Sequence, residues 1–188
     1  MFSYHLKNVA LVVLSATIAH AQAEQEVSYG IGRPVANSEI AAWDKDVRPD
    51  GRGLPAGSGT VAMGEQLYGE KCVACHGASG IGGPFDQLAG RIAEDAFPFA
   101  TDPSSVKTIG NYWPYATTLF DYINRAMPYD APGSLNTQQV YGLVAYLLHL
   151  NKIVPADATL SQDNLAKIIM PAQHRFVPDA RRGGAEVR

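Results

Sequence analysis

Cysteine is scarce in this sequence. The 188 residues contain only Cys72 and Cys75, and both lie in one five-residue stretch. A scaffold held together by several disulfides is therefore excluded, although such scaffolds are common among small exported proteins. A large excess of positive or of negative charge is also lacking, since 15 basic residues stand against 18 acidic ones. The net charge of −3 does not favour nucleic acid or an anionic membrane surface as a partner.

Long apolar runs and repeats are absent as well. No internal repeat and no extended alternation of apolar and polar residues occurs, so long β-strands are not expected. The apolar run 8–19 is too short to cross a bilayer as a membrane anchor. Lys7 before it and Ala19-His20-Ala21 after it are typical of a secretory signal peptide over residues 1–21. We therefore expect an exported protein with no membrane span in the mature chain.

Glycine and proline divide the rest of the chain. Residues 22–59 are dense in both, which predicts an extended arm interrupted by one short helix over 39–43, with Asn37 or Ser38 as its cap. Residues 60–152 carry helical patterns and are expected to form the compact domain. Residues 153–188 read as a C-terminal tail with one helical turn over 164–169.

Two helices are predicted at the start and middle of the domain. Thr60 is a plausible N-cap for the first, in which apolar and small residues recur at three- and four-residue steps up to Cys72. The second has an apolar face that begins at Ala116. It must end near Met127, because Pro128 disfavours helical geometry in the residue before it.

The last core helix is predicted from Asn136 or Thr137 to about residue 151. Its valines and leucines fill one broad arc, whereas Gly142, Ala145 and His149 fall on the far side. This distribution indicates an amphipathic helix that lies on a core.

The stretch Cys72-Val73-Ala74-Cys75-His76 is the attachment motif of a c-type haem. On a helix, positions i, i+3 and i+4 share one face. Both thiols can therefore reach the two vinyl groups of one porphyrin, while the imidazole reaches the iron. Three alternatives explain the motif less well: a redox-active cysteine pair, a zinc site and a structural disulfide. A redox-active pair usually follows a strand, and a zinc site needs about four ligands. The sequence predicts one covalent haem c, with His76 as an iron ligand.

Met127 is the predicted second iron ligand. It ends a helix and is released from helical geometry by Pro128, so its thioether can turn toward the haem; the alternative is a core methionine that fills a gap. A thioether ligand raises the reduction potential. The rival ligands are Met63, Met170, His149 and His174.

Other candidates for the haem pocket follow from residue type and position. The Pro84 carbonyl could accept a hydrogen bond from the His76 ring, or Pro84 could be an ordinary loop proline. Aromatic residues could wall the haem and donate to its propionates, or be plain core residues. The residues in question are Tyr112, Trp113 and Tyr115. Lys107 could pair with a propionate or be solvated.

Taken together, these residues resemble a class I cytochrome c. Gly64 and Tyr68 stand eight and four residues before Cys72, where that family packs its first helix against its last, and Leu143 and Tyr146 stand at the matching positions. The resemblance covers about 60–151. It implies an all-α fold in which three main helices surround one covalent haem, with the irregular arm and tail as extensions.

A narrower resemblance extends over about 28–181. The stretches 29–61, 107–129 and 175–181 look like the cytochrome subunit of periplasmic sulfur or sulfite dehydrogenases, including the sulfane dehydrogenase of the Sox system. That likeness implies a periplasmic protein that accepts electrons from a molybdenum-containing dehydrogenase subunit and passes them to a downstream cytochrome or oxidase. Longer members carry a second haem domain, whereas this chain has one attachment motif.

The expected function is thus electron transfer, with no catalytic residues and no enzymatic activity of the chain by itself. Two alternatives stay open at this point. One is a general soluble electron shuttle without a dedicated dehydrogenase, and the other is a haem enzyme or gas sensor with an open iron position.

Overall fold

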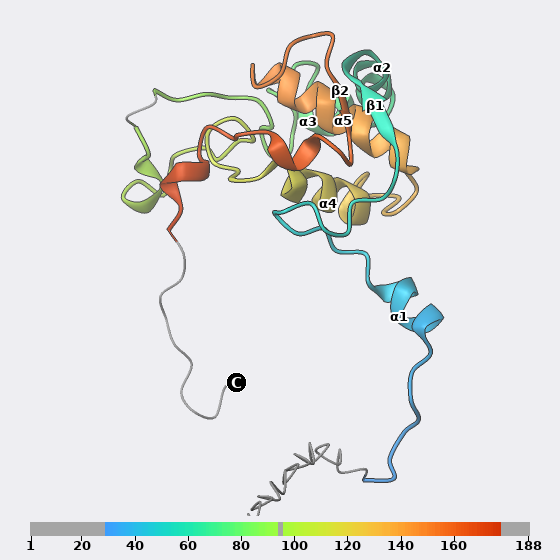
Figure 1. Cartoon of the computed structure of the whole chain (residues 1–188). Helices are drawn as coiled ribbons and strands as arrows, with labels where there is room; N and C mark the ends of the chain where they lie inside the picture. The colour runs from blue at the N-terminus through green and yellow to red at the C-terminus, as the bar shows by residue number, and fades with distance from the viewer. Residues whose placement is uncertain (1–28, 94–95, 178–188) are drawn as a thin grey trace, which may run out of the picture. The chain divides into compact units, whose positions relative to one another are not determined.

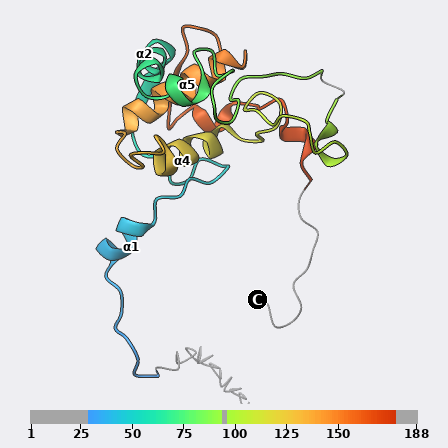
Figure 2. The same cartoon turned by 180° about the vertical axis from the view of Figure 1, so that it is seen from behind.

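The computed structural model describes residues 29–93 and 96–177; the expected signal peptide lies outside them. The chain divides into two units, and the second begins at Ala36. Figures 1 and 2 show the second unit from opposite sides. Its elements in chain order are α1 (Asn37–Trp43), β1 (Ser58–Thr60), α2 (Val61–Lys71), α3 (Val73–His76), η1 (Pro98–Ala100), α4 (Ala116–Ala126), α5 (Thr137–Leu150), β2 (Thr159–Ser161), η2 (Leu165–Lys167) and η3 (Gln173–Arg175).

The predicted caps of the two central helices are confirmed. The Thr60 hydroxyl accepts a hydrogen bond from the Met63 N–H at 3.2 Å, which begins α2. Asn136 and Gln139 form a reciprocal capping box that begins α5, with N···O distances of 3.0 and 2.9 Å. Both helices therefore begin where side-chain oxygens satisfy otherwise unpaired N–H groups.

Helix α5 is buried nearly all round, so the prediction of a single apolar arc is wrong. Gly142 and Ala145, expected on the exposed side, are buried, as is every residue over 140–148. The reason is α2, which crosses α5 at Gly64. A Cβ at Gly64 would overlap the Gly142 carbonyl and lie 2.8 Å from the Tyr146 Cβ. Two glycines thus allow the helix backbones to approach closely, and α2 covers the far side of α5.

Helix α4 has the face and the end that the sequence predicts. Its buried residues include Ala116, Leu119, Phe120 and Ile123. The helix ends at Ala126, and Met127 has extended geometry, with φ −125° and ψ 146°. The geometry is that expected of a residue before proline.

Besides the helices, the domain contains one short two-stranded sheet, which the sequence did not predict. Strands β1 and β2 pair antiparallel, with Gly59 opposite Leu160. At Gly59 a side chain would lie 2.6 Å from the Gln138 carbonyl, so glycine lets β1 lie directly on α5. Three-residue strands are too short to leave an alternating pattern in the sequence.

The tail packs on the domain after α5. Several of its side chains are buried in the main core: Val154, Leu160, Leu165 and Met170. The predicted turn near 164–169 is present as η2, and Leu165 within it is fully buried. This segment therefore contributes to the core of the domain, which its irregular sequence does not indicate.

Part of the arm also packs on the domain. The Val47 N–H donates to the Asp121 carboxylate of α4 at 2.9 Å, and the Tyr141 hydroxyl of α5 donates to the Pro55 carbonyl at 3.0 Å. Asp121 also accepts from Arg125 Nε at 3.0 Å. The segment 47–55 is thus held along α4 and α5, and Val47 is buried.

Helix α1, which lies nearer the N-terminus in the arm, differs from α2, α4 and α5. It begins at Asn37, so Asn37 and Ser38 lie inside the helix and do not cap it. None of its side chains is buried, and Trp43 is 88% exposed. Over the described ranges of the chain, no helix has the length and apolar character needed to span a bilayer.

Candidate haem site

The five-residue motif forms a tight turn at the end of α2. Cys72 separates α2 from α3, and its φ of −120° lies outside helical geometry. The Cys72 carbonyl nevertheless accepts hydrogen bonds from the N–H groups of Cys75 and His76, at 3.1 and 2.9 Å. The turn keeps the helical spacing, and both thiols are free and half-buried. A helix precedes the motif, as predicted.

The His76 ring is oriented by a carbonyl from the glycine-rich loop. Its Nδ1 lies 2.7 Å from the Asp86 carbonyl oxygen. A carbonyl can only accept, so Nδ1 carries the proton and Nε2 is left to bind a metal. The acceptor is the carbonyl of Asp86 and not that of Pro84. The sequence placed the candidate acceptor of this hydrogen bond at Pro84, whereas the structure places the acceptor two residues later, at Asp86.

Cys72 lacks the lowered pKa of a redox-active thiol, and the residues that the structure describes form no zinc site around it. Burial, with a smaller contribution from neighbouring Cys75, raises the pKa of Cys72 to about 11. A reactive Cys-x-x-Cys pair instead lowers the pKa of its thiol. Among the residues described, no group of three or more His, Cys, Asp and Glu side chains is placed to hold a metal ion. Two half-buried thiols with one oriented imidazole fit a covalent haem better than either alternative.

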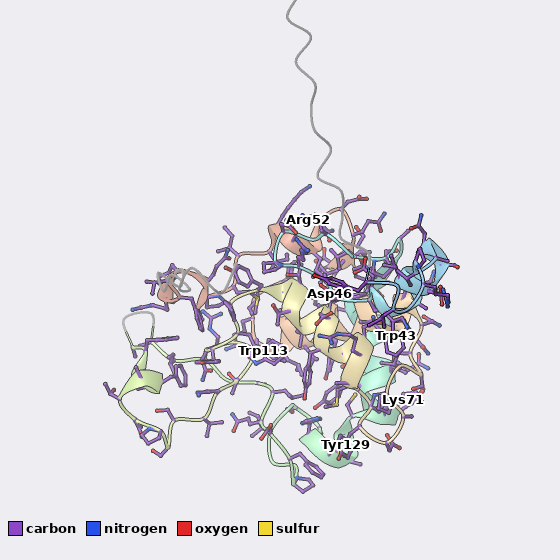
Figure 3. All side chains as sticks on the ribbon, turned by 90° about the horizontal axis from the view of Figure 1, so that it is seen from below. Trp43, Asp46, Arg52, Lys71, Trp113 and Tyr129 are labelled. Carbon is purple, nitrogen blue, oxygen red and sulfur yellow. The ribbon has the colours of Figure 1, made fainter. Side chains whose placement is uncertain are left out.

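The turn packs against the main core through Cys72 and Val73. Other half-buried apolar residues pack against the same core, among them Leu88, Trp113 and Met127. These three come from the loop after the motif, the loop before α4 and the residue that follows α4; Trp113 is labelled in Figure 3. Apolar side chains of this kind suit a porphyrin ring, which is itself largely apolar.

The other predicted pocket residues lie in different surroundings. Tyr112 stacks in an aromatic cluster with Phe97, Phe99 and Phe176, with ring centroids 5.0–6.1 Å apart. The Lys107 ammonium lies 4.8 Å from the centre of the Tyr112 ring. Tyr115 forms an isolated β-bridge with Ile169 of the tail. Of the three aromatic residues only Trp113, whose ring contacts Tyr122, packs against the main core.

The rival iron ligands are separated by their burial. Met170 is completely buried, and Met63 is 46% exposed on α2. His149 is half-buried, not solvated as expected, and its Nδ1 lies 3.2 Å from the Val154 carbonyl. His174 is exposed in the tail. Met127 is half-buried and packs against the main core, so it combines partial access to solvent with an apolar environment.

Sequence reasoning missed two residues that shape this region. One is Asp86, described above. The other is Asn151, which is buried after α5 and bonds the loop that follows the motif. Its Oδ1 accepts from the Gly90 N–H at 3.0 Å, and its Nδ2 donates to the Leu88 carbonyl at 3.2 Å. The only indication in the sequence is an asparagine at the end of a helix, which is common.

Comparison with known proteins agrees with this geometry. The Cytochrome c family model matches residues 61–151, the segment from α2 to the end of α5. A solved chain from the sulfane dehydrogenase SoxCD of Paracoccus pantotrophus matches with a TM-score of 0.73 and 39% identity, covering 82% of this chain and 74% of that chain. The chain belongs to the cytochrome c family. Membership implies a covalently bound haem c and makes the protein an electron-transfer component.

A curated relative agrees with this placement. Over 113 residues this cytochrome c is 32% identical to the thiosulfate dehydrogenase of Psychrobacter arcticus. The match covers 55% of this chain and 33% of that protein, so the chain spans about a third of its relative's length. The class I cytochrome c resemblance is confirmed at the level of the family.

Proposed function

We propose that this cytochrome c carries one haem and accepts electrons from a molybdenum-containing sulfur dehydrogenase subunit, sulfane or sulfite, in the periplasm. It then passes them to a downstream cytochrome or oxidase. The observation that carries the proposal is the extent of the SoxCD match. It covers 82% of the chain, whereas residues 61–151 make up less than half of it. The likeness therefore includes parts outside the haem domain, which a general electron shuttle does not need.

The residues that would hold the haem each have a separate task. Cys72 and Cys75 would anchor it through thioether bonds, and His76 and Met127 would bind the iron. The haem supplies a one-electron redox couple when bound. The Asp86 carbonyl keeps the proton on His76 Nδ1, which fixes the ring and increases the basicity of Nε2. Half-buried apolar side chains such as Val73 and Met127 would help to exclude water from the site, and a dry site disfavours additional charge on the iron.

Met127 is tested by a matched pair of substitutions. Met→Leu preserves side-chain volume and removes the thioether, so Met127→Leu should abolish the far-red absorption of a ferric thioether complex. It should also lower the reduction potential and let carbon monoxide bind the ferrous iron. Met170→Leu should leave all three unchanged. The opposite pattern would assign the iron to Met170 and contradict the assignment to Met127.

The same spectra distinguish the alternatives. A haem enzyme or gas sensor with an open iron position should bind carbon monoxide in the wild-type protein. A cytochrome with Met127 on its iron should resist it, since the thioether must first be displaced. Rapid carbon monoxide binding by the unmodified ferrous protein would favour the sensor.

The partner is tested by reduction kinetics. The purified molybdenum subunit of a sulfane dehydrogenase and that of a sulfite dehydrogenase are mixed in turn with the ferric cytochrome and the appropriate sulfur substrate. We expect fast haem reduction by one of them, with saturation at rising dehydrogenase concentration. Equal, slow and unsaturated reduction by both would indicate a general shuttle.

Helix α1 is the part of the arm available to such a partner. Deleting residues 28–45 removes Ile40 and Trp43, which are exposed, but keeps the segment 47–55 that packs on α4 and α5. The deletion should leave the haem spectrum unchanged and slow reduction by the dehydrogenase at least severalfold, because exposed aromatic residues are common binding anchors. Trp43→Ala should reproduce much of the loss, and Val106→Ala, which also truncates an exposed apolar residue, should not. Undiminished reduction of the deletion variant would remove α1 from the interface.

A further inference from the structure

A cleft lies beside the end of α5. It has a volume of about 660 Å³ and is formed by the loop after Gly90, the residues after α5 and the end of the tail. Neither the attachment motif nor any other residue assigned to the haem lines it. Six side chains bear on its chemistry: Arg91, Lys152, Ile153, Met170, His174 and Arg175.

Positive charge dominates the side chains that line this cleft. Arg91, Lys152 and Arg175 line it, and none of them forms an ion pair with a carboxylate of the described residues; Glu94 and Asp95 lie outside that part of the chain. The Arg91 guanidinium donates instead to a neutral group, the Asn151 carbonyl, at 3.3 Å. Cations held at one cleft repel one another, and a bound anion would relieve that repulsion.

The backbone at Lys152 is a second, independent observation. Over the described ranges it is the only residue other than glycine with positive φ, at 57°. Its N–H bonds the His149 carbonyl at 2.8 Å and the Ile153 N–H bonds the Leu148 carbonyl at 2.9 Å, which is a Schellman motif. The residue at this position is usually glycine, because a side chain there strains the backbone. A lysine therefore occupies a position that favours glycine, and this lysine is one of the residues that line the cleft.

The floor of the cleft is apolar and firmly built. Met170 is completely buried and Ile153 is half-buried, and both pack with the main core. An apolar floor keeps water from one side of a bound ion and strengthens its attraction to the surrounding cations. Guanidinium groups match the oxygens of tetrahedral oxyanions through paired hydrogen bonds.

We propose that this cleft binds a small divalent oxyanion of the sulfate, thiosulfate and phosphate class. Arg91 and Arg175 hold the oxygens, and Lys152 supplies further positive charge at the rim. The proposal does not depend on the identity of the electron donor, because none of its residues belongs to the haem site.

The test is a titration of the full-length ferrous holoprotein with sulfate, thiosulfate and phosphate in separate arms. Sodium chloride keeps the ionic strength constant, and backbone amide NMR shifts report the site. We expect saturable shifts confined to residues 91, 110–111, 152–153 and 170–175. The order of affinity among the three arms identifies the preferred anion. Shifts that chloride alone reproduces would overturn the proposal.

Variants separate a binding role from a structural one. Lys152→Gly removes the charge while suiting the backbone, so it should fold at least as stably as the wild type and bind the anion about threefold more weakly. Arg91→Gln with Arg175→Gln should weaken binding by more than about tenfold, since charge-assisted hydrogen bonds are lost. Lys45→Gly removes the same charge from the arm and should change nothing. Equal affinities in Lys152→Gly, the double variant and the wild type would refute the site.

Discussion

Replacing Cys72 and Cys75 together by alanine is expected to give colourless, poorly folded protein. The two half-buried thiols are the only cysteines in the chain, so no other residue can form a thioether to the haem. The small core would then lose the apolar surface that the haem is expected to supply, which weakens it. Absorption spectra and denaturant unfolding of the purified variant measure both effects.

The wild-type protein is the reference for covalent attachment. In acidic acetone it should retain its red colour, and its mass should exceed that of the polypeptide by one haem. The single variants Cys72→Ala and Cys75→Ala can each keep one thioether, and should retain part of the colour. Haem that acid acetone extracts from the wild type, or a mass that matches two haems, would contradict the proposed site.

Gly64→Ala is expected to cost at least about 1–3 kcal/mol of unfolding free energy, the usual range for an overpacked core. The new Cβ would overlap the Gly142 carbonyl and lie 2.8 Å from the Tyr146 Cβ. Neither neighbour is a flexible side-chain end, so α2 must move away from α5. Because the attachment motif follows α2 directly, the variant should also incorporate haem less efficiently. Denaturant unfolding and haem content measure the two losses.

Gly69→Ala is the matched control on the same helix. A Cβ at Gly69 has no heavy atom within 4 Å, and the residue is exposed. Alanine favours helical geometry over glycine, so this variant should gain about 0.5–1 kcal/mol. If both variants gain stability, the close approach of α2 and α5 is not what requires glycine at position 64.

The sequence predicted the helices of the domain well because their determinants are local. Thr60 caps α2 and Asn136 caps α5 through hydrogen bonds to residues three positions away. Pro128 ends α4 through a steric conflict with its immediate neighbour. Each of these interactions lies within one helical turn, so a short stretch of sequence contains all the information needed.

The surroundings of the helices were predicted less well because they depend on contacts between distant residues. Gly142 and Ala145 look like an exposed face until α2 covers them, and Gly64 lies more than seventy residues earlier in the chain. Met170 looks like a tail residue, yet it is completely buried. Val47 lies in a glycine- and proline-rich arm, yet Asp121 of α4 holds its N–H at 2.9 Å.

At the haem site, too, the sequence determined some features and the tertiary structure decided others. The sequence alone determined the chemistry: two thiols and an imidazole at helical spacing can react with one haem, and Met127 before a proline can leave its helix. Only the tertiary structure decided that Asp86, not Pro84, orients His76, since a loop can present any of several carbonyls to a ring. It also brought Arg91, Lys152 and Arg175 to one cleft. These residues are too far apart in the chain for any local rule to relate them. They come together because the tail folds onto the end of α5.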